Sequence, residues 1–222
     1  LLGANGAGKT TFFNVLTGLY TPDSGTFELA GKPYKPTAVH EVAKAGIART
    51  FQNIRLFAEM TAIENVMVGR HIRTKSGLLG AVFRTPGFKN EEAAIAKRSQ
   101  ELLDYVGIGK YADFKARTLS YGDQRRLEVA RALATDPKLI ALDEPAAGMN
   151  ASEKLVLREL IDQIRKDNRT ILLIEQAATT AIAFADRTAV LVGGRIVLQG
   201  GRYEMMTSAD VVRHYLGISD AA

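Results

Sequence analysis

The feature that most constrains this chain is a glycine-rich segment, Gly3–Thr10, which fits the pattern G-x-x-x-x-G-K-[ST]. It lies between the apolar pair Leu1-Leu2, which has the character of a buried strand end, and a helical pattern over Thr10–Leu19. A strand, a glycine turn and a helix in this order predict a phosphate-binding loop, in which backbone amides and the positive helix end face a phosphate. Lys9 would reach the β- and γ-phosphates, and the Thr10 hydroxyl would hold Mg²⁺. The candidate nucleotide-binding residues of this loop are Asn5, Gly6, Ala7, Gly8, Lys9, Thr10 and Thr11.

Two acidic residues follow an apolar run further along the chain. Leu139–Leu142 predicts a buried parallel strand, and Asp143 and Glu144 stand at its carboxyl end, where open α/β sheets bind ligands. Asp143 would hold the Mg²⁺ shell, and Glu144 would orient, or accept a proton from, the water that attacks the γ-phosphate. An acidic pair can be only a loop start, and the first motif can be a glycine turn with an incidental lysine. Together the two motifs favour nucleotide chemistry.

A serine–glycine segment, Leu119–Gln124, precedes a helical pattern over Arg125–Ala134. Ser120 with Asp123 three residues later has the form of a capping box, so an ordinary helix start explains the segment. The same helix end, with its serine hydroxyl and the amide of Gly122, could also hold a γ-phosphate. The segment alone does not decide between these interpretations.

Alternating strand and helix patterns predict an α/β fold with a mainly parallel sheet. We expect strands at Leu139–Leu142, Thr170–Ile174 and Ala189–Val192, with helices over Ala151–Arg165 and near Ala181.

Two features interrupt this alternation. The turn Pro22–Gly25 before the extended Thr26–Ala30 predicts a hairpin, and Gly193-Gly194 predicts a second hairpin turn, which together give an antiparallel β edge. Between residues 61 and 106 long helical segments replace the strand pattern, with an interruption near residues 76–87. We therefore predict a phosphate-loop NTPase core over residues 1–60 and 137–222 and an inserted helical subdomain over residues 61–136.

The composition excludes several other classes. Hydrophobic residues make up 46% of the 222 residues and charged residues 24%, which is typical of a globular chain. There is no cysteine, so disulfides and thiolate chemistry are excluded and a reducing compartment is favoured. The net charge of +5 is spread along the chain, which does not indicate a nucleic-acid-binding tail. No apolar run is long enough to predict a membrane span.

The order of the motifs resembles the nucleotide-binding subunit of an ABC transporter over essentially the whole chain. The motifs are the phosphate loop, Gln52 after an extended segment, the Leu119–Gly122 signature and the Asp143-Glu144 strand. The resemblance implies an ATPase that works as a dimer, each ATP lying between one subunit's phosphate loop and the other's signature helix. It also implies that Gln52 contacts Mg²⁺ and the membrane subunit, and that Ser120 and Gly122 contact nucleotide. The implied magnesium ligands are Thr10, Gln52 and Asp143.

Several segments look more narrowly like ATPases of branched-chain amino acid importers. These segments are Phe51–Phe57, Glu64–Gly69, Asp143–Asn150 and the ending His214–Gly217. Such importers carry two related ATPase subunits. Up to Ile174 the chain resembles one of them, and from Glu175 onward it looks more like the other, so a hybrid or an intermediate relative is one interpretation.

The likeness implies a peripheral protein at the cytoplasmic face of the cell membrane. Its implied partners are membrane-spanning permease subunits, an identical or related second ATPase subunit and, indirectly, a periplasmic or extracellular solute-binding protein, with no nucleic acid. ATPases of lipopolysaccharide export are the next alternative. The remaining alternatives are a soluble ABC protein acting on DNA or the ribosome and a degenerate ATP-binding regulator with little turnover.

The chain also departs from the family pattern. Asp123 replaces the usual signature glutamine and adds a negative charge near a predicted phosphate site, and Asn150 replaces the commoner aspartate of the interface loop. Gln176 stands where a histidine contacts the γ-phosphate, so it is the second predicted catalytic residue beside Glu144, and we expect it to limit turnover. Because the chain opens on Leu1-Leu2, the tail of an apolar run, we expect an N-terminally truncated chain, and the resemblance implies that the adenine-stacking aromatic lies in the missing part.

Helical spacing gives two expectations about packing. A solvated helix face is expected to carry Arg125, Arg126 and Arg131. The core is expected to contain Phe12, Phe13, Leu16 and Leu19.

Overall fold

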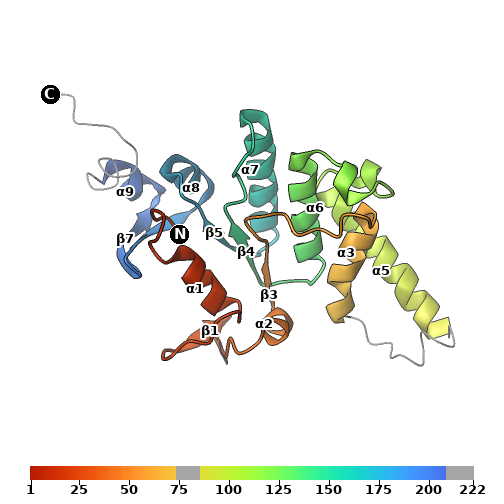
Figure 1. The fold of residues 1–222 in the computed structure, drawn as a ribbon, viewed down its shortest axis with the longest axis horizontal. Helices are drawn as coiled ribbons and strands as arrows, with labels where there is room; N and C mark the ends of the chain where they lie inside the picture. The colour runs from red at the N-terminus through yellow and green to blue at the C-terminus, as the bar shows by residue number, and fades with distance from the viewer. Residues whose placement is uncertain (74–85, 209–222) are drawn as a thin grey trace. The chain divides into compact units, whose positions relative to one another are not determined.

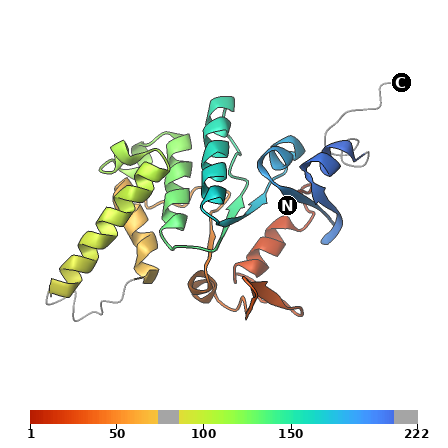
Figure 2. The same ribbon diagram turned by 180° about the vertical axis from the view of Figure 1, so that it is seen from behind.

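The computed structural model describes residues 1–73 and 86–208, so the predicted motif at 214–217 and most of the interruption at 76–87 lie outside the described residues. The chain divides into two compact units, Leu1–Val42 with Ala141–Ala222, and Ala43–Ile140. Figures 1 and 2 show the elements of both units from opposite sides. The division runs through helix α2 (Val39–Ala45) and strand β4 (Leu139–Asp143). Whether a nucleotide-binding core and a helical subdomain meet at residues 60–61 and 136–137 stays a prediction.

The first unit alternates strands and helices, as the sequence pattern predicts. Its further strands are β1 (Phe27–Leu29), β2 (Lys32–Tyr34), β5 (Thr170–Ile174), β6 (Arg187–Val192) and β7 (Arg195–Gly201). Its further helices are α1 (Lys9–Leu16), α7 (Ala151–Lys166), α8 (Ala178–Phe184) and α9 (Arg202–Thr207).

Leu2 connects the end of β5 to β6 by pairing with both. It forms parallel bridges with Glu175, just after β5, and with Val190 in β6. The Leu2 amide donates to the Ala189 carbonyl over 2.8 Å, and the Leu191 amide donates to the Leu2 carbonyl over 2.7 Å. Leu2 is fully buried, so it occupies the strand position that its apolar character predicts.

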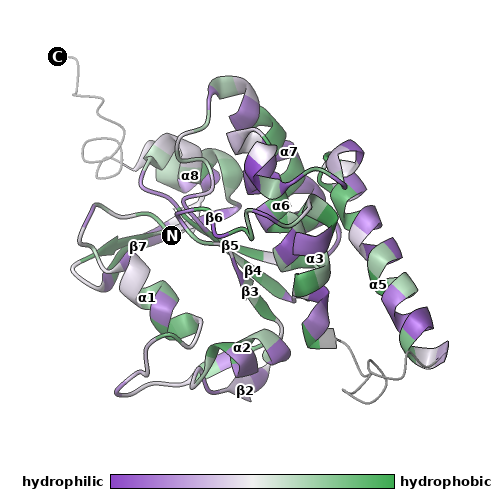
Figure 3. Cartoon of the chain, turned by 45° about the vertical axis from the view of Figure 1, so that its right-hand side comes forward, coloured by the Kyte–Doolittle hydropathy of each residue, from purple (hydrophilic) through white to green (hydrophobic). Residues whose placement is uncertain are grey.

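Helix α7 connects β4 to β5 and has one buried face. Leu157, Leu160, Ile161 and Ile164 lie on that face, and the remaining positions are mostly polar, so the helix alternates in colour in Figure 3. Asn150 caps its first turn by accepting from the Glu153 amide over 3.0 Å. A strand, a helix and a neighbouring strand in this order form the crossover that gives a parallel sheet.

Two hairpins provide the predicted antiparallel edge. β6 pairs with β7 around Gly193 and Gly194, whose φ angles are +55° and +78°. β1 pairs with β2, but the turn between them is Ala30-Gly31, with φ angles of +52° and +72°. The prediction of a turn at Pro22–Gly25 is therefore wrong for the hairpin, because that turn only leads into β1.

Helix α1 is shorter than expected. It ends at Leu16, and Gly18 takes a φ of +74° while the Leu19 amide donates back to the Asn14 carbonyl, a pairing typical of helix ends. Phe13 is fully buried, but Phe12 and Leu19 are 41% and 48% exposed, so their assignment to the core is wrong. Helical spacing is interrupted at the helix end, and Leu19 therefore leaves the buried face.

The second unit is mainly helical, as predicted for most of its length. It contains β3 (Ile47–Arg49), α3 (Ala62–Arg70), η1 (His71–Arg73), α5 (Pro86–Tyr105), η2 (Gly109–Tyr111), η3 (Ala116–Thr118) and α6 (Tyr121–Leu133). Helices α3, α5 and α6 pack together through Val66, Leu102, Leu103 and Leu127. In the first residues of β4, the Leu139 amide donates to the Gly46 carbonyl just before β3.

Candidate functional site

The glycine-rich loop leads directly from the Leu2 strand position into α1. Gly8 is the residue before the helix and has a φ of +100°, a conformation that favours glycine. A Cβ at Gly3 would lie 2.6 Å from the Leu191 carbonyl oxygen, so only glycine fits there. None of the described side chains caps the start of α1, so the positive end of the helix is open to a ligand. The polar residues Asn5, Thr10 and Thr11 are exposed.

Lys9 is held against its own loop. Its Nζ donates to the Gly3 carbonyl over 2.6 Å and to the Ala4 carbonyl over 3.0 Å, and the side chain is buried. The ammonium group thus lies inside the loop, whose backbone would surround a phosphate.

Asp143 and Glu144 stand at the same sheet edge as this loop. Asp143 ends β4 and is buried, and the Glu144 amide donates to the Ile174 carbonyl at the end of β5 over 3.0 Å. Since Leu2 pairs beside Glu175, the loop begins where β4 and β5 end. Glu144 has a φ of +44°, a conformation that costs a residue with a side chain about 1 to 2 kcal/mol. A strained acidic residue at this edge agrees with a functional role.

Glu175 is a buried acidic group that sequence reasoning did not include in the site. Its Oε1 accepts from the Ala146 amide over 3.4 Å. Burial raises the pKa of Glu175 to about 7, the Ala146 amide opposes this rise, and the nearby Glu144 charge adds to it. Its neighbour Gln176 is exposed just beyond the strand. The only sequence signal that could have placed Glu175 in the site is its position at the end of an apolar strand.

The second unit contains the other predicted residues. The Ser120 hydroxyl accepts from the Asp123 amide over 3.2 Å, so Ser120 is the N-cap of α6. The Asp123 carboxylate accepts from the Ser120 hydroxyl over 2.8 Å and pairs with Arg126. The extra negative charge of Asp123 therefore has a positive partner on the same helix.

The expected solvated arginine face on α6 is wrong. Arg125 is 4% exposed and forms an ion pair of 3.3 Å with Glu128, which is 2% exposed. Arg126 and Arg131 are half-buried, and Arg131 lies over the Phe57 ring at 5.8 Å. Helical spacing places these residues on the helix but does not show that the chain between β3 and α3 covers them.

Gln52 belongs to that covering segment. Its carbonyl, together with that of Phe51, accepts from the Arg125 guanidinium. The Glu128 carboxylate accepts from the amides of Phe51 and Arg55 over 3.4 and 3.5 Å. Burial raises the pKa of the Glu128 carboxyl, and Arg125 and the two amides oppose this rise.

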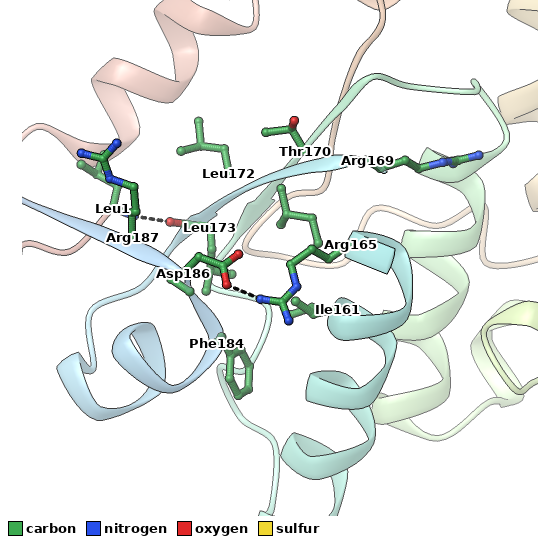
Figure 4. A pocket seen from close by; sticks show the side chains of 12 residues that line it. Leu1, Ile161, Arg165, Arg169, Thr170, Leu172, Leu173, Phe184, Asp186 and Arg187 are labelled. Atoms are coloured by element: carbon green, nitrogen blue, oxygen red, sulfur yellow. Dashed lines mark hydrogen bonds and ion pairs between the residues drawn. The ribbon is translucent and has the colours of Figure 1, made fainter. Parts of the chain in front are cut away.

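A cavity of about 380 Å³ lies elsewhere in the first unit. Figure 4 shows it between the start of β5, the end of α7 and the segment Phe184–Arg187, beside the ion pair of Arg165 with Asp186. These are the amino ends of β5 and β6, so the cavity lies away from the edge that carries the loop. Its described lining residues include none of the predicted site residues.

The comparisons with known proteins agree with this geometry. The family model described as "ABC transporter" matches residues 1–147. The chain therefore belongs to the ABC transporter family, and it is an ATPase of that family. In the part of the chain that the structure describes, no helix is long and apolar enough to cross a bilayer.

Individual relatives extend the likeness to nearly the full length. The chain is 43% identical over 218 residues to the high-affinity branched-chain amino acid transport ATP-binding protein LivG of Salmonella typhimurium, covering 98% of this chain and 86% of the relative. It is 40% identical, with the same coverage, to BraF of Pseudomonas aeruginosa, a protein of the same description. Among solved structures, the ADP conformation of MJ1267, an ATP-binding cassette of an ABC transporter, matches with a TM-score of 0.81 and 29% identity, covering 98% of this chain and 86% of that one.

Proposed function

We propose that this chain is the energy-coupling ATPase of an importer for branched-chain amino acids. The observation that carries the proposal is the meeting of the phosphate loop with the ends of β4 and β5 at one sheet edge. The amino acid class rests on the likeness to LivG and BraF over 98% of this chain and 86% of each relative, whose names describe branched-chain amino acid transport.

The loop supplies the phosphate contacts in this proposal. Asn5, Gly6, Ala7 and Gly8 offer backbone amides, and Lys9 offers a cation already held within the loop. Glu144, in its strained turn, orients the attacking water and accepts its proton. Gln176 offers an amide that can hydrogen-bond the γ-phosphate but adds no charge. In the second unit, Gln52, Ser120 and Gly122 contact nucleotide.

The residues present fit a magnesium ion. The Thr10 hydroxyl, the Asp143 carboxylate and the Gln52 amide oxygen are hard oxygen donors of the kind that Mg²⁺ prefers. Thr10 is exposed beside the loop, and Asp143 stands at the end of β4. When bound, Mg²⁺ would neutralise charge on the phosphate oxygens.

The proposal includes partners and a place of action. Membrane-spanning permease subunits and a second ATPase subunit are the direct partners, and a solute-binding protein acts through the permease. The site of action is the cytoplasmic face of the membrane, to which the chain binds peripherally. The ion pair of Asp123 with Arg126 favours an active ATPase over a degenerate regulator, because the unusual carboxylate is offset.

The test is the variant Glu144→Gln. It should stop ATP hydrolysis while ATP binding is kept, because the amide preserves size and polarity but cannot accept the proton from water. Steady-state phosphate release and nucleotide titration measure the two quantities. The matched control is Glu159→Gln, an exposed residue on α7, which should hydrolyse at the parent rate. Parent-level turnover in Glu144→Gln would contradict the proposal.

A further inference from the structure

The ion pair of Arg125 and Glu128 on α6 is the most deeply buried ion pair among the described residues. The two side chains are 5% and 2% exposed, and Arg125 Nη1 lies 3.3 Å from Glu128 Oε2. A buried ion pair is costly unless further hydrogen bonds satisfy both groups. The partners of these further hydrogen bonds therefore show which segment of the chain the ion pair holds in place.

Both groups direct their remaining hydrogen bonds to one short segment. Arg125 Nη1 donates to the Phe51 carbonyl over 2.8 Å, and Nη2 donates to the Gln52 carbonyl. Glu128 Oε1 accepts from the amides of Phe51 and Arg55. A planar guanidinium can bridge two carbonyls and a carboxylate at once, which an ammonium cannot do with the same geometry.

The pair also connects this segment to the start of α6. Arg125 donates from Nη2 and Nε to the Tyr121 hydroxyl over 2.9 and 3.2 Å, and Tyr121 follows the N-cap Ser120. On the other side, the Phe51 ring packs against the guanidinium of Arg55 at 4.4 Å. One guanidinium thus contacts both the backbone of Gln52 and the first turn of α6.

We propose that Arg125 and Glu128 are positioning residues that fix the backbone of residues 51–55 to α6, so that Gln52 and Ser120 keep one geometry relative to each other. The inference rests on the proposed function, in which Gln52 and Ser120 both contact nucleotide. The pair acts on turnover through the placement of Gln52, whose carbonyl accepts from Arg125. Its loss should lower kcat and leave the loop around Lys9 able to bind ATP.

Two variants test the proposal by hydrogen exchange and by kinetics. Arg125→Lys keeps the charge but not the fork of donors, and the double variant Arg125→Met with Glu128→Leu removes both buried charges together, which tends to preserve folding. In both, amide exchange over residues 51–55 should become about tenfold faster. The kcat for ATP should fall about 10- to 100-fold, with KM within about twofold of the parent because binding at the loop is untouched.

The matched control is the pair Arg98 and Glu101 on α5. It has the same i, i+3 spacing and an N–O distance of 3.0 Å, but the side chains are 38% and 48% exposed. Arg98→Met with Glu101→Leu should change neither exchange at residues 51–55 nor kcat.

The outcomes separate this inference from the proposed function. Unchanged exchange at residues 51–55 in the Arg125 variants would overturn the fixing of the segment, and faster exchange with unchanged kcat would overturn its effect on turnover. A parent chain that does not hydrolyse ATP, or a Gln52→Ala variant with parent kcat, would instead count against the proposed function. In that case the exchange result alone still decides whether the pair holds the segment.

Discussion

Glu175 is a carboxyl group whose protonation is linked to folding. It is 5% exposed, and burial raises its pKa from 4.5 to about 7. At pH values between 4.5 and about 7, Glu175 has lost its proton in the unfolded chain but keeps it in the folded chain. The folded state therefore binds more protons, and this residue lowers stability as pH rises from about 4.5 through 7.

Replacing Glu175 by glutamine should remove this cost. The amide oxygen can still accept from the Ala146 amide, but it never takes a charge. We expect Glu175→Gln to be more stable than the parent at pH 8, by at most about 3 kcal/mol, and the difference to vanish near pH 4.5. Urea unfolding at pH 5 and pH 8 measures it.

The control for this prediction is Glu159→Gln on the exposed side of α7. It should shift stability by no more than about 0.5 kcal/mol at either pH. A Glu175→Gln effect of equal size at both pH values would show that the residue does not titrate in this window.

At the scale of single residues, spacing in the sequence predicts which side chains share an element but not what covers them. Gly8 could be predicted because a local turn requires its positive φ, whereas the need for glycine at Gly3 comes from the distant Leu191 carbonyl. The burial of Arg125 could not be predicted, since the carbonyls that it contacts lie 73 and 74 residues away in the sequence. Its burial depends on a long-range contact, and no local pattern encodes that contact.

Elements begin and end where backbone groups find partners, and α7 is a clear example. Asn150 Oδ1 accepts from the Glu153 amide, and Glu153 Oε2 accepts from the Asn150 amide, both over 3.0 Å. This capping box satisfies amides that the helix itself leaves unpaired. Asn150 therefore has a local structural role as well as its place in the loop after Glu144.

Removing this cap should destabilise the chain. We expect Asn150→Ala to lower the free energy of unfolding by about 1 kcal/mol. Asn150→Asp is the matched variant, because a carboxylate accepts the same hydrogen bond and a negative charge is favoured at a helix start. Urea unfolding compares the three proteins, and an alanine variant as stable as the parent would show that the cap contributes nothing.

Element boundaries could be predicted where the signal is local. The range of β5 is the predicted one, since an apolar run ends there at polar residues. The end of α1 has a local signal in Gly18, whose left-handed backbone is typical of the residue after a helix, but the apolar spacing continues to Leu19 and hides it. The turn between β1 and β2 could not be predicted, because it needs left-handed backbone at Ala30 as well as at Gly31. Alanine in that conformation has no sequence signature, so the sequence pattern favours the more obvious turn at Pro22–Gly25.

At the scale of the whole molecule, the chain consists of two compact units that carry different parts of the predicted machinery. The loop, Asp143, Glu144 and Gln176 belong to the first unit, and Gln52, Ser120 and Gly122 belong to the second. The order of motifs predicts the family, and the match of the ABC transporter model confirms it. Sequence spacing cannot predict how two units cooperate, because that depends on long-range contacts and on partners.

The loop ending at Lys9 is expected to bind MgATP, and calorimetric titration of the parent and of Lys9→Ala tests this binding most directly. The parent should bind MgATP, and Lys9→Ala should bind about 10- to 100-fold more weakly or not at all, because it loses charge-assisted hydrogen bonds to phosphate. Lys35→Ala, an exposed lysine of the same unit, should bind like the parent. Equal MgATP affinity in Lys9→Ala and the parent, with both proteins folded, would contradict the account.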